Sequence, residues 1–467
     1  MSAAPAWWTA LRAELAPLLP GLRVAVYASG GAPYHHAALV AQWGGVPEPL
    51  SAERIQAGAL AGYDVLVMPG GGLLGMGGLL AALGVEGSTQ IREWVAGGGM
   101  YVGSCAGAYL PARVPTSFAE QHPAILPLHL LDVPLANGAD GGLGGLDSPG
   151  VGVLHAAVSA PTHWLTRGLP PHFEVVHYNG PCFTPTVGSD VAAVTRVEAA
   201  GEAFTPWERS LPGDAPALVD TLIESRAANV VAGPFGDGTV VLFGSHPEFG
   251  FDALQLGWGE AARLFGNALL YQSGRRRRAE PSVSVSAMTT DLTDVADALS
   301  TASQRFQRLT TLAPDLSGAP AFLGSTPTAL WTAALSEAAT LSADTAEYVM
   351  ALTTVPTAYG PWLDSPAAPG QDYGFVGLRQ LAAQILSLLD QAEEHLRSPP
   401  PPVTSPYGEW DRHPYHLLAS SYLSAAGLSA SASLAAGTLG TLSGTDRPPP
   451  HPMFRPLWTS PERKDHD

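Results

Sequence analysis

The 467-residue sequence has two cysteines, a single lysine and no long run of apolar residues. Two cysteines cannot build the disulfide framework of a small secreted domain, so we expect the protein to reside in the reducing environment of the cytoplasm. No apolar stretch approaches the ~18 residues that a membrane span needs. Residues 1–20 lack the basic start and the apolar core of a signal peptide. The sequence therefore predicts a cytoplasmic protein that does not bind a membrane.

Positive charge is also scarce, because 23 basic residues face 41 acidic ones and the formal net charge is −18. An acidic surface repels phosphate backbones, so we expect no nucleic-acid partner. The one basic run, Arg275–Arg278, is interpreted as a solvated linker or helix end rather than as a polyanion site. No spacing of His and Cys resembles a zinc ligand set, and we predict neither a metal nor another cofactor.

Short apolar runs alternate with helical patterns over the first 274 residues. Strand with helix in alternation predicts an α/β fold with a doubly wound, mostly parallel sheet that is covered on both faces. The predicted strands are 22–28, 64–69, 99–103, 151–158, 173–178, 191–197, 228–233 and 239–244, and helical patterns include 34–43, 88–96 and 251–272. The Gly- and Pro-rich stretch 111–150 is interpreted as either a lid or a variable surface loop.

The pattern changes after Arg278, where apolar residues recur at helical spacing. Helices are predicted at 292–309, 327–351, 378–396 and 414–437, which suits a small bundle of about four helices. The predicted organisation is a leading helix (1–20), an α/β domain (21–274), a linker (275–288), a helical domain (289–440) and a Pro-rich, disordered tail (441–467). The apolar stripes of the helical domain are interpreted as residues of its core. Binding of a protein partner through this domain stays an alternative.

Cys105 lies in the run Gly103-Ser104-Cys105-Ala106-Gly107, directly after an apolar stretch. This pattern is typical of a nucleophile elbow, a sharp strand-to-helix turn whose flanking glycines let two backbones approach closely. A thiol at a helix N-terminus is placed where the helix dipole favours the thiolate. The alternative is a small buried hydrophobic residue, as free cysteines often are.

Two further segments agree with this interpretation. The apolar run 240–243 leads through Gly244 and Ser245 into His246-Pro247-Glu248, so an imidazole and a carboxylate follow a predicted strand. They would complete a Cys-His-Glu triad, because active groups of parallel sheets gather at the carboxyl ends of strands. The predicted strand 64–69 runs into Gly70-Gly71-Gly72, whose backbone N–H groups, with that of Ala106, would face an oxyanion.

The order of these motifs resembles the class I glutamine amidotransferase-like superfamily. More narrowly, it is similar to the amino-terminal domain of eukaryotic biotin–protein ligases and its free-standing bacterial relatives. The segments that carry the resemblance are Val24–Tyr27, Val67–Gly71, Gly103–Tyr109, Tyr178–Pro181 and His246–Glu248, spread over residues 20–272. The resemblance implies a flavodoxin-like α/β fold and a small-molecule substrate or ligand.

Carried over by position, the resemblance implies Cys105 as nucleophile, His246 as general base and then acid, and Glu248 as the group that orients it. The implied oxyanion donors are Gly71 and Ala106. The implied substrate-binding residues are Gly70, Gly72, Tyr109, Tyr178, Asn179 and Gly180.

Two departures from the family limit what it implies. A glutaminase usually has glutamine four residues after the cysteine, and Tyr109 stands there, which puts glutamine hydrolysis in doubt. No Gly-Arg-Gly-Arg-like adenylate loop follows residue 280, so we expect no biotinylation. Two functions stay open: a cysteine hydrolase that attacks an amide or acyl group, and a non-catalytic binding or regulatory module that uses the same pocket.

The other His and Cys residues that we considered have no motif around them that indicates catalysis. Cys182 is interpreted as a buried structural thiol, and His177 as a core histidine that is able to reach the pocket. His35 and His36 either line the mouth of the site or begin a solvated helix.

Overall fold

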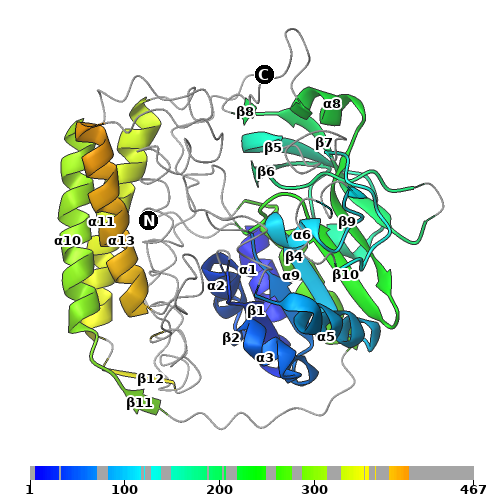
Figure 1. The fold of residues 1–467 in the computed structure, drawn as a ribbon, viewed down its shortest axis with the longest axis horizontal. Helices are drawn as coiled ribbons and strands as arrows, with labels where there is room; N and C mark the ends of the chain where they lie inside the picture. The colour runs from blue at the N-terminus through cyan, green and yellow to red at the C-terminus, as the bar shows by residue number, and fades with distance from the viewer. Residues whose placement is uncertain are drawn as a thin grey trace.

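The computed structural model describes residues 6–30, 33–70, 82–116, 120, 128–137, 149–186, 189–201, 204–206, 218–248, 259–275, 287–312, 328–351, 353–356, 363 and 378–398. Figure 1 shows one large sheet with helices packed on it, and a separate group of long helices that follows it in the chain.

A single mixed sheet organises the first part of the chain, in the order β2-β1-β3-β4-β10-β9-β7-β5-β6, with β8 paired to β5. The strands β2, β1, β3, β4 and β10 are parallel, and the remaining pairs are antiparallel. Their bounds are β1 Val24–Tyr27, β2 Pro47–Leu50, β3 Val65–Met68, β4 Met100–Ser104, β5 Gly150–Val158, β6 His172–Tyr178, β7 Ala192–Ala200, β8 Thr205–Pro206, β9 Ala228–Phe235 and β10 Gly238–Phe243.

The parallel strands are buried on both faces, as strands covered by helices must be. Alternate residues enter two separate cores: Val65 and Val67 of β3 point into one, and Leu66 and Met68 into the other. The first core also takes in residues of α1 (Ala6–Leu15), α2 (Tyr34–Gln42) and α9 (Ala262–Arg275). The second takes in residues of α3 (Ala52–Gln56) and α5 (Gly84–Ala96). Helices therefore cover both faces, which is the doubly wound arrangement.

Short helices connect these elements. They are η1 (Leu19–Gly21), η2 (Ala59–Gly62), α6 (Ala106–Tyr109), η4 (Trp164–Thr166) and α8 (Leu218–Glu224). Among them α6 matters most for the site, since it begins directly after Cys105.

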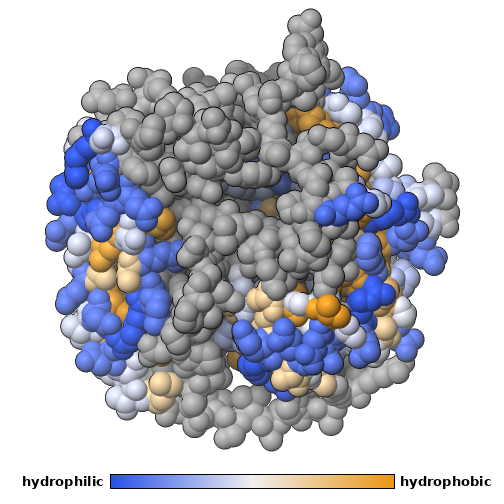
Figure 2. All heavy atoms as spheres, in the orientation of Figure 1, coloured by the Kyte–Doolittle hydropathy of each residue, from blue (hydrophilic) through white to orange (hydrophobic). Residues whose placement is uncertain are grey.

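Three long helices follow the sheet: α10 (Thr293–Leu312), α11 (Thr328–Ala351) and α13 (Leu378–Arg397). Helix α10 packs against both α11 and α13, with Phe306 and Leu299 fully buried. β11 (Ala287–Thr289) and β12 (Thr354–Pro356), which precede α10 and follow α11 in the chain, pair as a small two-stranded antiparallel sheet. Polar side chains dominate the visible outer face of these helices, and apolar ones form a narrower band (Figure 2).

The predicted α/β fold with a later helical region is confirmed. The antiparallel half of the sheet is a feature that strand patterns alone do not distinguish, because both kinds of strand are apolar runs. The predicted helix 414–437 and the tail 441–467 lie outside the described residues, as do parts of the 275–288 linker and of the 111–150 stretch. The domain boundaries stay predictions. None of the helices in the ranges given above is both long and apolar enough to cross a bilayer.

Candidate functional site

The candidate site lies where three parallel strands end. Cys105 follows β4, His246 and Glu248 follow β10, and Gly70 follows β3. These strands are neighbours in the sheet in the order β3-β4-β10, so their carboxyl ends bring residues from distant parts of the sequence to one edge.

The backbone at Cys105 has φ 48° and ψ −111°, a conformation that non-glycine residues rarely adopt. Two flanking glycines make the turn possible. A Cβ at Gly103 would lie 2.3 Å from the Gly107 carbonyl oxygen, and a Cβ at Gly107 would lie 2.3 Å from the Met68 carbonyl oxygen. Two hydrogen bonds hold the turn: Cys105 N–H donates to Phe243 O at 2.9 Å, and Tyr101 OH donates to Gly107 O at 2.7 Å. Cys105 therefore lies at a sharp turn between β4 and α6.

His246 and Glu248 form a buried pair beside the cysteine. The His246 Nδ1 atom lies 2.8 Å from Glu248 Oε1, with only 5% and 2% of these residues exposed. A Cβ built on Gly70 would be 2.6 Å from His246 Cε1 and 3.3 Å from Cys105 Cβ. Imidazole and thiol thus flank the same glycine, and only a residue without a side chain fits between them.

The charges of this pair are set by their neighbours. Burial alone lowers the pKa of His246, but Cys105 and Glu248, through charge and hydrogen bonding, raise that pKa to about 10. Burial alone raises the pKa of Glu248, but His36, His246 and hydrogen bonds bring that pKa down to about 2. At neutral pH His246 is therefore an imidazolium beside the ionised carboxylate of Glu248.

The second carboxylate oxygen of Glu248 has partners of its own. Ser104 Oγ lies 3.3 Å from Oε2, and His36 Nε2 lies 3.4 Å from the same oxygen. Burial lowers the pKa of His35 to about 4 and also lowers that of His36, so both imidazoles are neutral at pH 7. His36 is thus part of the site, while the sequence left its role open.

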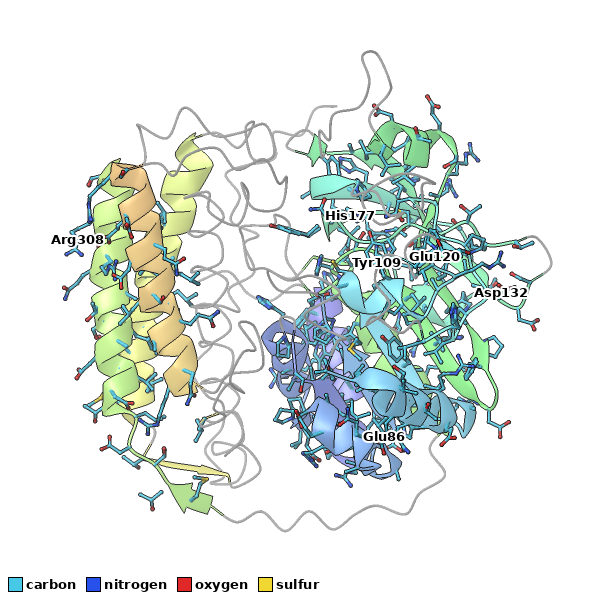
Figure 3. The ribbon with its side chains drawn as sticks, in the orientation of Figure 1. Glu86, Tyr109, Glu120, Asp132, His177 and Arg308 are labelled. Atoms are coloured by element: carbon cyan, nitrogen blue, oxygen red, sulfur yellow. The ribbon has the colours of Figure 1, made fainter. Side chains whose placement is uncertain are left out.

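Tyr109 joins two other segments of the chain near the cysteine. Its hydroxyl donates to Asn179 O at 2.9 Å and accepts from Asn137 Nδ2 at 2.8 Å. Asn179 has a φ of 52°, and Tyr178 O accepts from Cys105 Sγ at 3.2 Å. The segment 178–180 therefore lies against the nucleophile, and Figure 3 labels Tyr109 at α6, near this segment.

Gly180 is required at this contact. A Cβ there would meet Gly244 O at 1.8 Å and Cys105 Cα at 3.3 Å. His177, at the end of β6, is fully buried, and its Nδ1 lies 3.1 Å from Ser245 Oγ. Burial lowers the pKa of His177 to about 3, with the neighbouring His246 as a further cause.

Most residues singled out from the sequence come together here. The contacts given above link Cys105 and its neighbour Ala106 to Gly70, Tyr109, Tyr178, Asn179, Gly180, His246 and Glu248. Gly71 and Gly72 lie outside the described residues. Sequence reasoning missed Ser104 and Asn137. Ser104 lies inside the motif around Cys105, so its position in the sequence could have indicated that it belongs to the site. Asn137 lies in the irregular stretch 111–150, where no sequence pattern indicated a site residue. In the ranges the structure covers, no three His, Cys, Asp or Glu side chains are arranged to hold a metal ion.

Comparison with known proteins agrees with this geometry. Residues 60–124, which include Cys105, match the family model described as biotin-protein ligase, N terminal. The resemblance to that family is confirmed for this segment. None of the curated proteins matches the chain.

Solved structures similar to this chain share little sequence with it. The cytoplasmic protein STM3548 from Salmonella typhimurium is 16% identical, over 54% of this chain and 98% of its own, with a TM-score of 0.34. The glutaminase domain of CTPS from Trypanosoma brucei, with bound acivicin, is 12% identical over 56% and 96%, with a TM-score of 0.33. A ThuA-like protein from Parabacteroides merdae is 11% identical over 56% and 94%, with a TM-score of 0.33.

Proposed function

We propose that this chain is a cysteine-dependent hydrolase of an amide or a related acyl compound. The observation that carries the proposal is the buried series Cys105, His246 and Glu248, in which the 2.8 Å contact between His246 Nδ1 and Glu248 Oε1 leaves Nε2 as the ring nitrogen for the thiol. This is the division of roles found in nucleophile–base–acid triads.

The reaction proceeds in two halves. The thiolate of Cys105, whose proton His246 already holds, attacks the substrate carbonyl carbon, and the tetrahedral oxyanion accepts a hydrogen bond from the N–H of Ala106, the first amide of α6. His246 then protonates the leaving amine or alcohol, and a thioester remains on Cys105. In the second half His246 takes a proton from water as the resulting hydroxide attacks the thioester, and collapse of the tetrahedral intermediate releases the carboxylic acid and restores the thiolate beside the protonated His246. Gly71 is the second oxyanion donor that we propose.

The pocket wall argues for a substrate other than glutamine. The Tyr109 hydroxyl hydrogen is committed to Asn179 O, so Tyr109 has no proton to donate to a substrate carboxamide. The position where a glutaminase has glutamine is instead filled by a ring that is 5% exposed. We therefore propose a small acyl substrate that does not depend on a hydrogen bond from this position.

The test uses p-nitrophenyl acetate as a generic acyl donor. Acylation should release p-nitrophenolate in a burst that matches the enzyme concentration, and mass spectrometry should find one acetyl group on the peptide that contains Cys105. Cys105→Ala should give no burst. His246→Gln should slow acylation and, more strongly, the loss of the acetyl group, because both halves need the base.

Cys182 provides the internal control. It is fully buried, and burial raises the pKa of its thiol to about 12, so it should stay unlabelled in the folded protein. Absence of an acetyl group on Cys105, with the protein folded, would refute the hydrolase proposal.

A second candidate, a binding module without turnover, is favoured by one observation. Cys105 is 8% exposed, and its sulfur is within hydrogen-bond distance of Tyr178 O, so the segment 178–180 covers the nucleophile. Binding without turnover would appear as a stoichiometric acetyl-Cys105 that persists equally in the wild type and in His246→Gln.

A further inference from the structure

The Glu248 carboxylate uses both of its oxygens, and only one of them faces His246. Oε2 lies 3.3 Å from Ser104 Oγ and 3.4 Å from His36 Nε2, and these two atoms are 3.0 Å from each other. The three residues come from three separate elements: His36 from α2, Ser104 from the end of β4, and Glu248 from the turn after β10. A closed triangle of polar atoms therefore lies behind the triad.

Burial determines how the protons are arranged in this triangle. Ser104 and His36 are fully buried and Glu248 is 2% exposed, so water does not provide the missing hydrogen bonds. An ionised carboxylate only accepts, so the Ser104 hydroxyl donates to Oε2. Its oxygen then accepts from His36, which assigns the proton of His36 to Nε2.

The other nitrogen of His36 supports this assignment. Among the described residues, His36 Nδ1 has no hydrogen-bond partner. A buried lone pair without a partner costs less than a buried N–H without one, so the neutral Nε2–H form is favoured over the imidazolium. Burial also lowers the pKa of His36. His36 thus acts as a neutral donor whose ring cannot easily take up a proton.

We propose that Ser104 and His36 are positioning residues that keep the Glu248 carboxylate ionised and turned toward His246. The proposal rests on the proposed function, since it assigns these residues to the same triad. It extends the series by two members, in the order Cys105, His246, Glu248, Ser104 and His36.

The physical reason is the cost of a buried carboxylate. Hydrogen bonds to the charged form lower a carboxyl pKa, and each one that is lost raises it. The other titratable groups that face this site are His35, His177, His246 and Cys105, of which His35 and His177 are neutral at pH 7. Apart from His246 and the backbone N–H of Glu248 itself, the Glu248 carboxylate therefore accepts from the Ser104 hydroxyl, whose oxygen in turn accepts from His36. When Glu248 takes up a proton, His246 loses its anionic partner and the thiolate loses its imidazolium.

The first measurement is the pH dependence of Cys105 alkylation by iodoacetamide in the full chain. Ser104→Ala and His36→Leu should move the acid limb of the profile upward by about one pH unit, the shift that matches one lost hydrogen bond to a charged group. His36→Gln should restore most of the wild-type profile, because the glutamine Nε2 is a donor near the position of the histidine Nε2. Ser342→Ala, which removes another buried serine from α11, should leave the profile unchanged.

The second measurement reads the carboxyl group itself and does not require a reactive thiol. In protein labelled with 13C at the glutamate carboxyl carbon, Glu248→Gln identifies the Glu248 resonance. We expect this resonance to stay at its ionised position from pH 4 to 9 in the wild type, and to titrate between about pH 4 and 6 in the Ser104→Ala/His36→Leu double variant.

The two measurements separate the two proposals. A wild-type Cys105 that is not alkylated at neutral pH would count against the hydrolase, while the carboxyl titration would still test the role of Ser104 and His36. A Glu248 resonance that stays ionised in the folded double variant would overturn the inference.

Discussion

At the scale of single residues, the site depends on close backbone contacts that only glycine allows. Gly107 lets α6 begin against the end of β3, where a Cβ would be 2.3 Å from Met68 O and 2.8 Å from Pro69 O. Both atoms belong to the backbone, so the contact cannot relax by moving a side chain. The elbow is therefore a feature of packing between strand and helix as well as of the turn itself.

Gly107→Ala should for this reason lower the free energy of unfolding by about 3 kcal/mol, a typical cost of overpacking. Gly274→Ala is the matched control, since Gly274 lies in α9 and a Cβ there meets no atom within 4 Å. That change should be neutral or stabilising by about 0.5–1 kcal/mol, because alanine favours the helix. Urea denaturation measures both. Equal effects of the two substitutions would contradict the close approach of α6 and β3.

The ionisation of His246 leads to a prediction about stability and pH. Its pKa is about 10 in the folded protein and 6.5 without perturbation, so the folded state binds the proton more tightly. The resulting stabilisation is complete below pH 6.5 and is lost as pH rises through about 10. His246→Gln should be less stable than the wild type by about 2 kcal/mol at pH 6. The gap should narrow between pH 7 and 10 in denaturation curves, and a gap that stays constant would refute the raised pKa.

Sequence patterns predicted the candidate residues that follow apolar runs, and they left open or missed the contacting residues that have no such signal. Cys105 stands between glycines after an apolar run, and His246 and Glu248 follow another such run. These candidate residues are therefore placed at the ends of predicted strands. His36 was left undecided because a histidine at a helix start has several ordinary roles. Its contact with Ser104 and Glu248 joins α2 to the end of β4 and to the turn after β10, and no local sequence pattern contains such a contact.

At the scale of elements, the parallel strands were predictable because they are uniformly apolar, whereas β2 was not. Its sequence, Pro47-Glu48-Pro49-Leu50, has two prolines and lacks the strand pattern. Proline is tolerated in strands at sheet edges, and β2 is the edge strand beside β1. The exception is thus explained by the position of the strand in the sheet, which sequence periodicity does not reveal.

The long helices are joined by a partly buried arginine. Arg305 of α10 lies 2.8 Å from Asp390 and 2.9 Å from Glu393, both on α13, with 10% of its side chain exposed. Glu393 is also largely buried, so loss of Arg305 would leave its carboxylate with less compensation. This contact should determine how α10 and α13 pack.

Arg305→Met should therefore destabilise the helical region by about 2 kcal/mol, less than the cost of breaking a fully buried pair because Asp390 is exposed to solvent. Arg308→Met is the control on the same helix: Arg308 is exposed and points away from the other helices (Figure 3). It should change stability by less than about 0.5 kcal/mol. Thermal unfolding followed by circular dichroism would distinguish the two, and similar shifts for both variants would contradict the account.

At the scale of the whole molecule, the site and the long helices are carried by different parts of the chain. Every described residue that contacts Cys105, His246 or Glu248 in the interactions above precedes residue 249. The second core, which contains Ala106 and Tyr109, is built from residues before 275, whereas the first core also includes residues between 292 and 392. We therefore expect the reactivity of Cys105 to depend on the α/β part of the chain and not on the long helices.

A fragment of residues 1–286 should consequently fold and keep the alkylation profile of Cys105. We expect one cooperative unfolding transition and an alkylation rate at pH 7 within about twofold of the full chain, since sites without shared contacts behave independently. A fragment that folds but loses the reactivity of Cys105 would show that the helical region contributes to the site.

The most direct test of the central claim is the rate of Cys105 alkylation at pH 7 relative to pH 9, in the wild type and in His246→Gln. A free cysteine thiol with a pKa of about 8.5 reacts about 20-fold more slowly at pH 7 than at pH 9. If His246 holds the proton of Cys105, the wild-type rates should differ by less than about threefold, and His246→Gln should show the larger ratio of a free thiol. A wild-type ratio near 20, or the same ratio in both proteins, would contradict a thiolate–imidazolium pair in this site.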